Sequence, residues 1–219
     1  MIRRRPGVAG SLRGVGMITT VLFDINDVLF RYDRSLRVAH LAALCGRAAA
    51  EVEAAIWGSG FEDSADSGRM DADAYLSGFG ARLGVDLTAA QWADALRAAV
   101  RPMPETLALA AAVAGRARRV AALTNNNLMV KRALDAVFPE LRPIFGPNVF
   151  GSAEFLAVKP NPGAYLGCLA RLGAAPGETL FIDDSPRNVA GAERAGLRAH
   201  LFRDRDGLAA ALRAAGLNS

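Results

Sequence analysis

Carboxylates and small polar side chains stand directly after segments that have the composition of buried strands. Three such segments end in these residues: Asp24, Asn26, Thr124, Asn125, Asp183 and Asp184. Lys159 lies in the loop before the helix pattern that precedes the last of these segments. The carboxyl ends of parallel strands meet along one edge of an open sheet, where ligands bind in such folds. The order of these residues therefore predicts one site with a candidate nucleophile, two small polar groups, one cation and an acidic pair.

Lysine is rare in this chain, which gives Lys159 added interest. Arginine supplies 24 of the 26 basic residues, and the only lysines are Lys131 and Lys159. Lysine carries a compact charge that suits a small charged centre, whereas arginine suits planar, bidentate partners. A lysine at position 159 therefore favours contact with a small anionic group. The alternative is that Lys159 is an ordinary surface lysine.

The hydrophobic pattern alternates between strands and helices. Short apolar runs that predict buried parallel strands occur at five places: 19–26, 118–127, 147–152, 177–185 and 197–204. Helical patterns separate or follow most of them: 105–114, 127–137, 162–172, 187–195 and 206–215. Such alternation indicates right-handed crossovers and a parallel sheet with helices on both faces. The sequence predicts an α/β fold with a Rossmann-like, doubly wound sheet.

A block of about seventy residues at 32–100 interrupts this alternation. It contains helix-period stretches and no convincing strand, the stretches being 35–50, 49–57, 71–83 and 88–100. We interpret the block as an inserted, all-helical cap domain with hinges near Tyr32 and at 102–104. The Rossmann-like core then consists of the remaining two segments, 17–31 and 101–219.

The first sixteen residues carry the excess positive charge of the chain. The formal net charge is +4, and residues 1–16 hold four arginines and no acid, so the remainder is neutral. We expect 1–16 to form a flexible basic tail, with Met17 as a candidate natural start. The tail lacks the apolar run of a secretory signal. A neutral remainder does not favour a nucleic-acid partner, which would need basic charge along the phosphate backbone.

Composition argues against several other classes of protein. The chain is 52% hydrophobic and 22% charged, which is typical of folded proteins and not of disordered ones. No stretch approaches the ~20 apolar residues that a membrane span needs. Cys45 and Cys168 are too few for a disulfide framework or a cysteine-rich zinc site, and they fit a reducing compartment. We therefore expect a cytoplasmic protein without a membrane partner.

Four motifs, in this order, resemble those of the haloacid dehalogenase superfamily of hydrolases. They are FDINDVLF at 23–30, LTNN at 123–126, the lysine of VKPNP at 158–162, and FIDDS at 181–185. The resemblance covers nearly the whole chain after residue 16. The helical insertion after the first strand is similar to the small-cap subgroup of this superfamily, in its phosphatase-like branch.

The resemblance implies a role for each matching position. Asp24 would be the nucleophile that attacks phosphorus and forms an aspartyl-phosphate. Mg²⁺ would be held by oxygen ligands, namely those of Asp24, the backbone carbonyl of Asn26, Asp183 and Asp184. Thr124 and the backbone amide of Asn125 would bind the phosphoryl oxygens, and Lys159 would balance charge between nucleophile and phosphate.

Asn26 departs from the family pattern, which usually has a second aspartate here as general acid and base. An amide cannot protonate a leaving alcohol, and general acid–base catalysis typically contributes ~10²–10⁴-fold. Three interpretations follow. In the first, the chain is a phosphatase that works without this acid or recruits Asp27 or a cap side chain. In the second, it is a 2-haloacid dehalogenase-type hydrolase. In the third, it is a weak or inactive protein that binds a phosphorylated ligand or partner. Three crowded carboxylates need a cation to keep the nucleophile ionised, which favours the magnesium-dependent phosphatase over the metal-free dehalogenase.

The cap is expected to set specificity, because its helices close over the site and exclude water. Candidate cap residues that face the site are Arg31, Tyr32, Arg34, Trp57, Phe61 and Arg69. His40 and His200 are assigned no catalytic part. The expected ligand is a small phosphorylated metabolite, such as a sugar phosphate, and the periodicity leaves monomer and homodimer open.

Overall fold

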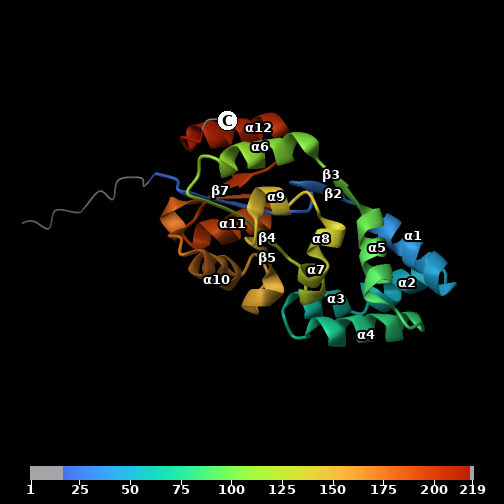
Figure 1. Ribbon diagram of the computed structural model, residues 1–219. Coiled ribbons are helices and arrows are strands. Elements are labelled where there is room, and N and C mark those ends of the chain that lie inside the picture. Colours follow the sequence, from blue (N-terminus) through green and yellow to red (C-terminus); the bar gives the residue numbers. More distant parts are fainter. Residues whose placement is uncertain (1–16, 218–219) are drawn as a thin grey trace, which may run out of the picture.

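Five parallel strands form the centre of the computed structural model, which describes residues 17–217 (Figure 1). They are β1 (Thr20–Phe23), β4 (Arg119–Thr124), β5 (Val149–Gly151), β6 (Thr179–Asp183) and β7 (Arg198–Leu201). Their order in the sheet is β5-β4-β1-β6-β7. The chain thus starts in the middle, moves outward to one side, and then crosses to the other, which is the Rossmann-like pattern. The predicted doubly wound α/β fold is confirmed, and the tail expected at 1–16 lies outside the described residues.

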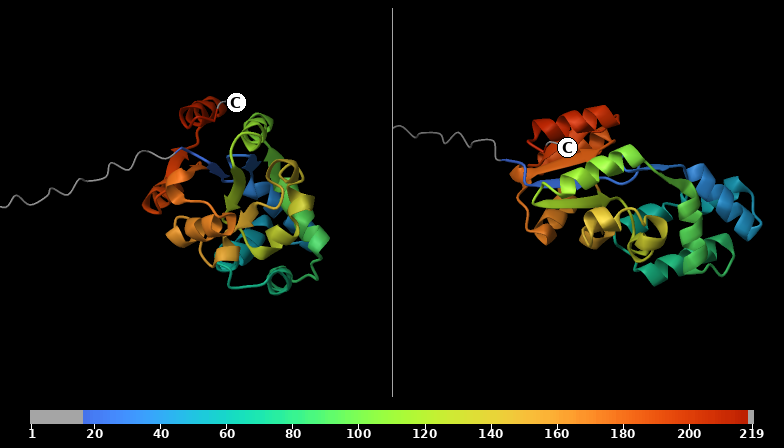
Figure 2. Two further views of the ribbon diagram at one scale, coloured as in Figure 1. Left: turned by 60° about the vertical axis from the view of Figure 1, so that its left-hand side comes forward. Right: turned by 45° about the horizontal axis from the view of Figure 1, so that its top comes forward.

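Each face of the sheet is covered by its own layer of helices (Figures 1 and 2). Within β1, Val21 and Phe23 join one apolar cluster, and Leu22 joins the other. The helices on the first face are α6 (Pro104–Ala114), α9 (Arg142–Phe145) and α12 (Arg205–Ala214), and those on the second are α10 (Pro162–Leu172) and α11 (Pro186–Arg194). Because successive strand side chains point to opposite faces, a strand covered on both sides is buried throughout and mostly apolar, as the TVLF sequence of β1 is.

Residues 33–99 fold as a helical cap beside one end of the sheet (Figure 1). Its helices are α1 (Arg34–Cys45), α2 (Ala49–Ile56), α3 (Phe61–Asp66), α4 (Ala72–Leu83) and α5 (Ala89–Ala99). Aromatic side chains fill its interior. The rings of Phe61 and Tyr75 stack with their centroids 5.3 Å apart, and the ring of Trp92 meets that of Tyr75 edge-on at 5.8 Å. The cap therefore has apolar packing of its own.

A two-stranded antiparallel ribbon joins the cap to the core. In it β2 (Phe30–Tyr32) pairs with β3 (Val100–Pro102). From the sequence we expected hinges near these points but no strand within 32–100, and the ribbon corrects that expectation. Strands of three residues are too short to show a period of two, and their pairing depends on partners about seventy residues apart.

The single helix predicted at 127–137 is in fact two short helices. α7 (Leu128–Arg132) ends and α8 (Leu134–Val137) begins at Ala133, whose φ of −92° and ψ of 10° are not helical. After the break, the ring of Phe138 packs against that of Phe30 with centroids 4.9 Å apart. Tertiary packing therefore overrides local helix propensity here. The short helices α3, α9, η1 (Ser152–Phe155) and η2 (Pro176–Glu178) were also not predicted.

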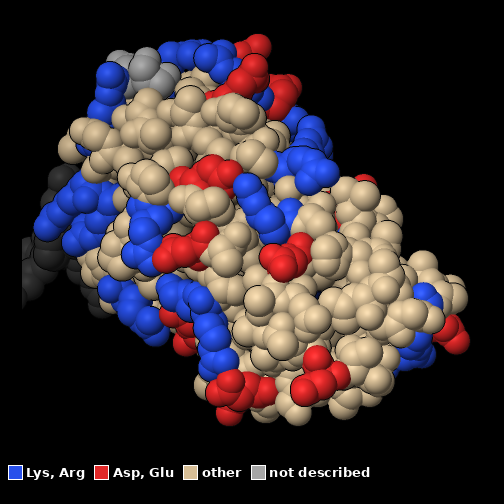
Figure 3. Space-filling view, turned by 45° about the vertical axis from the view of Figure 1, so that its right-hand side comes forward, with Lys and Arg blue, Asp and Glu red and all other residues tan. Residues whose placement is uncertain are grey.

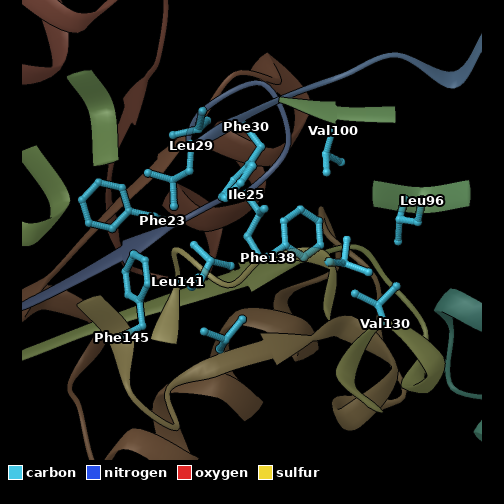
Figure 4. Close-up of a cluster of buried hydrophobic side chains, with 14 of the residues drawn as sticks. Phe23, Ile25, Leu29, Phe30, Leu96, Val100, Val130, Phe138, Leu141 and Phe145 are labelled. Carbon is cyan, nitrogen blue, oxygen red and sulfur yellow. The ribbon is translucent and has the colours of Figure 1, made fainter. Parts of the chain in front are cut away.

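An apolar cluster below the turn after β1 joins the core to the cap. Figure 4 shows Phe23 of β1 near Phe145 and Ile25 of the turn near Phe138, with Val100 of the ribbon and Leu96 of α5 on the side of the cap. Burial of each large apolar side chain contributes roughly 1.5–3 kcal/mol to stability. The cluster therefore anchors the backbone that carries the polar residues of the turn.

Acidic and basic side chains are interspersed on the face of the molecule drawn in Figure 3. Among the described residues, no helix has the length and apolar character that a membrane crossing requires. Cys45 and Cys168 are free thiols, in agreement with the low cysteine count.

Gly191 offers a direct test of the packing between α11 and the loop that contains Lys159. A Cβ at position 191 would lie 2.6 Å from the carbonyl oxygen of Pro160, whereas one at Gly177 would meet open space. We predict that Gly191→Ala lowers the free energy of unfolding by ~1–3 kcal/mol through overpacking, and that Gly177→Ala changes it by less than ~0.5 kcal/mol. Urea denaturation measures both. Equal stabilities for the two variants would contradict the tight contact.

Candidate functional site

The carboxyl ends of β1, β4 and β6 bring predicted site residues together. Asp24 follows β1, Thr124 ends β4, and Asp183 ends β6, and all three are buried. Because β1 pairs with both other strands, their ends are adjacent. The backbone N–H of Asp24 donates to the carbonyl of Ile182 at 2.8 Å, which continues the pairing one residue beyond β1.

Lys159 bridges the two buried aspartates. Its Nζ donates to Oδ1 of Asp24 at 2.8 Å and to Oδ2 of Asp183 at 2.7 Å, and its side chain is only 1% exposed. Burial by itself lowers the pKa of Lys159, but the charges of Asp24 and Asp183 outweigh that effect and raise it above its ordinary value. The ammonium therefore stays charged and holds the two carboxylates close together.

Asn125 positions the backbone that carries Lys159. Its side-chain Nδ2 donates to the carbonyl oxygen of Lys159 at 2.9 Å, and its Oδ1 accepts from the Lys159 N–H at 2.8 Å. From the sequence we assigned a role only to the backbone amide of Asn125. The paired hydrogen bonds of its side chain connect residues 34 positions apart, which no local pattern indicates.

Asp183 is occupied by hydrogen bonds, whereas Asp184 lies closer to solvent. The Oδ1 of Asp183 accepts from the N–H of Ser185 at 2.9 Å and from Nδ2 of Asn188 at 3.0 Å, and its Oδ2 accepts from Lys159. Asp184 is half-buried. Oxygen atoms of Asp24, Asp183 and Asp184 lie within 4.8 Å of one another. Three carboxylates this close form a candidate cation site.

The three carboxylates repel one another. Burial raises the pKa of Asp24 to about 7, with Lys159 opposing the rise and Asp183 adding to it. Burial also raises the pKa of Asp184, and the charges of Asp183 and Asp27 add to that rise. With all three carboxylates ionised, the single ammonium of Lys159 leaves two negative charges in excess. A divalent cation would offset that excess and keep Asp24 ionised near neutral pH.

In the turn after β1, Asn26 lies at the edge of the site, whereas the side chain of Asp27 takes part in the turn itself. The side-chain Oδ1 of Asn26 is buried without a hydrogen-bond partner in the described part of the chain. Asp27 adopts a left-handed backbone with φ of 57°. Its N–H donates to the carbonyl of Phe30 at 2.6 Å, and its Oδ1 accepts from the N–H of Tyr32 at 3.4 Å. Asp27 therefore contributes to the turn that begins the ribbon.

The asparagines after β4 shape the loop that faces the cap. Nδ2 of Asn126 donates to the hydroxyl oxygen of Thr124 at 2.8 Å, which leaves the hydroxyl proton of Thr124 available to a ligand. Asn127 caps α7, because its Oδ1 accepts from the N–H groups of Met129 and Val130 at 3.0 and 3.3 Å. The sequence predicted a site role for Thr124. It did not indicate the hydrogen bond from Asn126 to Thr124 or the capping of α7 by Asn127.

A cavity of about 200 Å³ lies between the core and the cap and opens beside Asn26 and Asn125. Apart from Leu96, it is lined by polar and aromatic residues: Asn26, Tyr32, Arg34, Arg37, Trp57, Glu62, Asp63, Asp66, Asn125, Asn126 and Phe138. This volume is below the roughly 300–1,000 Å³ of pockets for drug-sized ligands. The cavity therefore suits a small, polar group.

Half of the cap residues expected to face the site do line this cavity. Tyr32, Arg34 and Trp57 are among its lining residues. The other three do not line it: Phe61 is buried in the cap interior against Tyr75, and Arg31 and Arg69 are exposed. Arg37, Glu62 and Asp66 were missed. Helical periodicity indicates which residues face the inside of the cap. It does not indicate which of these line a cavity and which pack in the apolar interior.

Arg37 is a buried cation in the wall of this cavity. Its Nη1 lies 3.4 Å from Oε1 of Glu62, with side-chain exposures of 6% and 12%. Its guanidinium lies 5.4 Å from the ring centre of Trp57 and 5.1 Å from that of Trp92. Oε1 of Glu62 also accepts from the hydroxyl of Tyr75 at 2.8 Å. The pair fixes α1 against α3 through a charge contact shielded from solvent.

Removing one member of this buried pair should be costly. We predict that Arg37→Met lowers the free energy of unfolding by ~3–5 kcal/mol, because Glu62 is left buried without its cation. Arg34→Met on the same helix is the matched control. The Arg34–Glu53 pair is half-exposed, so its loss should cost less than ~1 kcal/mol. Urea denaturation compares the two, and losses of equal size would contradict the account.

The chain belongs to the haloacid dehalogenase-like hydrolase family, whose sequence model matches residues 18–196. That range includes the cap and four of the five strands of the sheet, all but β7. The resemblance seen in the four motifs is thereby confirmed at the level of the family. The chain is a hydrolase of this class.

Comparison with individual proteins supports the same assignment. A curated relative, phosphatase MT3486 of Mycobacterium tuberculosis (strain CDC 1551 / Oshkosh), is 37% identical over 92 residues, which is 42% of this chain and 42% of that protein. The match thus spans less than half of the relative. A predicted HAD-like family hydrolase from Porphyromonas gingivalis superposes with a TM-score of 0.69 at 28% identity, covering 84% of this chain and 91% of that one.

A second solved structure has the same fold. It is the HAD family enzyme bt-2542 from Bacteroides thetaiotaomicron, in complex with magnesium and inorganic phosphate. The TM-score is 0.70 at 21% identity, with 85% of this chain and 94% of that chain covered. At this identity the likeness concerns the fold.

Proposed function

We propose that this protein is a magnesium-dependent phosphatase that hydrolyses a small phosphomonoester through an aspartyl-phosphate at Asp24. The observation that carries the proposal is the cluster of Asp24, Asp183 and Asp184 around the single ammonium of Lys159. Its excess negative charge calls for a cation, and a cation beside a nucleophilic carboxylate suits attack on phosphorus. Similarity to a curated phosphatase over part of the chain supports this choice.

The donor set fits Mg²⁺. This ion prefers oxygen ligands and keeps several of its waters. Asp24 and Asp184 would supply carboxylate oxygens, and the turn after β1 would supply the backbone carbonyl of Asn26. Asp183 would support the site, since its oxygens already accept from Lys159, Ser185 and Asn188. The bt-2542 enzyme of the same fold has been solved with magnesium and phosphate. Bound Mg²⁺ would supply electrostatic stabilisation of the charge on the phosphoryl oxygens.

The side chains of this protein account for both steps of hydrolysis. An oxygen of Asp24 attacks phosphorus, the bond from phosphorus to the ester oxygen breaks, and the ester oxygen must take up a proton to leave as an alcohol. Water then attacks the phosphorus of the aspartyl-phosphate and releases phosphate from Asp24. Lys159, the hydroxyl of Thr124 and the N–H of Asn125 hold the phosphoryl oxygens. Asn125 also positions Lys159 through its two backbone contacts.

The leaving group would occupy the cavity between core and cap. Its volume of about 200 Å³ suits a small metabolite such as a sugar phosphate. Buried Arg37 has two nitrogens, Nε and Nη2, without a hydrogen-bond partner among the described residues. Hydroxyl groups of a polar ligand could accept hydrogen bonds from them. We therefore propose a small phosphorylated metabolite as the ligand.

The two other readings of the sequence have less support. A metal-free dehalogenase needs an ionised Asp24, and the neighbouring carboxylates together with burial oppose that state. A protein that binds phosphorylated ligands without turnover agrees with Asn26, which cannot act as an acid. It does not account for Lys159, which is charged, buried and in direct contact with the proposed nucleophile.

The first test of the proposal is the nucleophile itself. We predict that the protein hydrolyses phosphorylated metabolites with Mg²⁺ and loses activity in excess chelator. Asp24→Asn should lower turnover by more than about 10³-fold, because the covalent route is lost. Asp71→Asn, on the cap at the start of α4, is the control and should retain activity. Phosphate-ester turnover that persists in excess chelator would contradict the magnesium dependence, and chloride release from 2-chloropropionate would support the dehalogenase instead.

The pH dependence of Mg²⁺ binding is a second test. The pKa of Asp24 is raised to about 7 without metal, so the carboxyl is protonated below that pH, whereas Mg²⁺ binds the ionised form. We predict proton release on binding and an affinity that weakens by up to about tenfold per pH unit below pH 7. Isothermal titration calorimetry at pH 6, 7 and 8 in two buffers measures both. An affinity independent of pH over this range would contradict the account.

A further inference from the structure

A leaving alcohol needs a proton, and the residue in the usual position cannot give one. Asn26 is an amide, and Asp27 contributes its carboxylate to the turn through the N–H of Tyr32. Without an acid, the ester oxygen would depart as an alkoxide, which slows the first step by roughly 10²–10⁴-fold. A proton donor elsewhere in the wall of the leaving-group cavity would remove this difficulty.

Asp66 lies in that wall, on the cap side. It is the last residue of α3 and lines the cavity together with Asn26, Asn125 and Asn126. It is half-buried, so part of its surface remains available to a ligand. The cavity that would hold the leaving group thus has the proposed phosphoryl-binding loop on one side and the carboxyl of Asp66 on another.

Contacts with the core hold Asp66 in this place. The hydroxyl of Ser152 donates to the backbone carbonyl of Asp66 at 2.8 Å, and Nδ2 of Asn127 lies 3.4 Å from its Oδ1. Two residues later the chain passes so close to the core that a Cβ on Gly68 would lie 2.5 Å from the carbonyl oxygen of Ala153. The end of α3 is therefore fixed against the loop that follows β4 and against η1.

The surroundings of Asp66 favour its protonated form. None of the ion pairs found among residues 17–217 includes Asp66, whereas neighbouring Glu62 is paired with Arg37. Burial raises the pKa of Asp66 well above its ordinary value, the charge of Glu62 raises it further, and Arg37 and Asn127 oppose the rise. Asp63 on the same helix also raises it. Buried carboxyls kept neutral in this way act as general acids in other hydrolases.

We propose that Asp66 is the general acid and base of this protein and takes the place of the aspartate that Asn26 replaces. In the first step, Asp24 bonds to phosphorus, the ester bond breaks, and the ester oxygen takes the proton of Asp66 to leave as an alcohol. In the second step, the Asp66 carboxylate accepts a proton from the water that attacks phosphorus, and the bond from phosphorus to Asp24 breaks. This inference rests on the proposed phosphatase activity.

Leaving-group dependence separates an acid from a structural residue. p-Nitrophenyl phosphate has a leaving group that departs as an anion, whereas sugar and polyol phosphates need a proton on the alcohol. We predict that Asp66→Asn lowers kcat on the best sugar or polyol phosphate by ~10²–10³-fold. On p-nitrophenyl phosphate it should lower kcat less than about threefold. The control, Asp94→Asn, changes an exposed aspartate on α5 and should alter neither rate.

The recovery of activity in a double variant and the pH dependence of kcat provide two independent readouts. Asn26→Asp restores an acid at the usual position, so the double variant Asn26→Asp/Asp66→Asn should regain most of the activity lost on the alkyl ester. Wild-type kcat on that ester should fall at high pH as Asp66 loses its proton, and Asp66→Asn should lack this limb of the profile. A structural role would move neither readout.

The possible outcomes test the role of Asp66 and the phosphatase activity separately. Equal losses on both classes of ester, or failure of the double variant to recover, would overturn the role of Asp66. A wild-type protein that hydrolyses p-nitrophenyl phosphate but no alkyl phosphate would also overturn it, because no acid would then be at work. A wild-type protein that hydrolyses neither class would overturn the phosphatase itself.

Discussion

The site depends on the contact between one buried ammonium and two buried carboxylates. Lys159 holds Asp24 and Asp183 together, and Asp184 adds a third acid beside them. One positive charge does not balance three negative charges. Burial raises the pKa values of Asp24 and Asp184, and the neighbouring carboxylates raise them further. We propose that a divalent cation corrects the imbalance of charge, and that with this cation in place the cluster of three carboxylates would bind a phosphoryl group.

The rest of the fold keeps this unfavourable arrangement in position. The apolar cluster under the turn after β1 fixes the backbone of Asp24 and Asn26 (Figure 4). Asn125 fixes the backbone of Lys159 with two hydrogen bonds, and α11 packs on the same loop through the contact of Gly191 with Pro160. Charged groups that repel each other persist only where the surrounding packing determines their places.

The core side of the site could be predicted from the sequence, and the cap side only in part, since Tyr32, Arg34 and Trp57 line the cavity as expected. Asp24, Thr124 and Asp183 lie at the carboxyl ends of strands whose apolar runs the sequence shows, and parallel strands end at one edge whatever the details of packing. Arg37, Glu62 and Asp66 belong to a cavity that forms only when cap and core meet. The side-chain contacts of Asn125 with Lys159 and the pairing of β2 with β3 likewise join distant segments. Local periodicity holds no information on such contacts, so these features were missed, and the helix expected at 127–137 was wrong for the same reason.

Anomalous diffraction tests directly whether a cation binds among the carboxylates. Crystals grown with Mn²⁺, an ion that also accepts oxygen ligands, should show one strong anomalous peak in contact with the carboxylates of Asp24 and Asp184. That peak should disappear in crystals of Asp184→Asn prepared identically. No peak at this position in the unmodified protein, at Mn²⁺ concentrations that saturate other magnesium enzymes, would contradict the account.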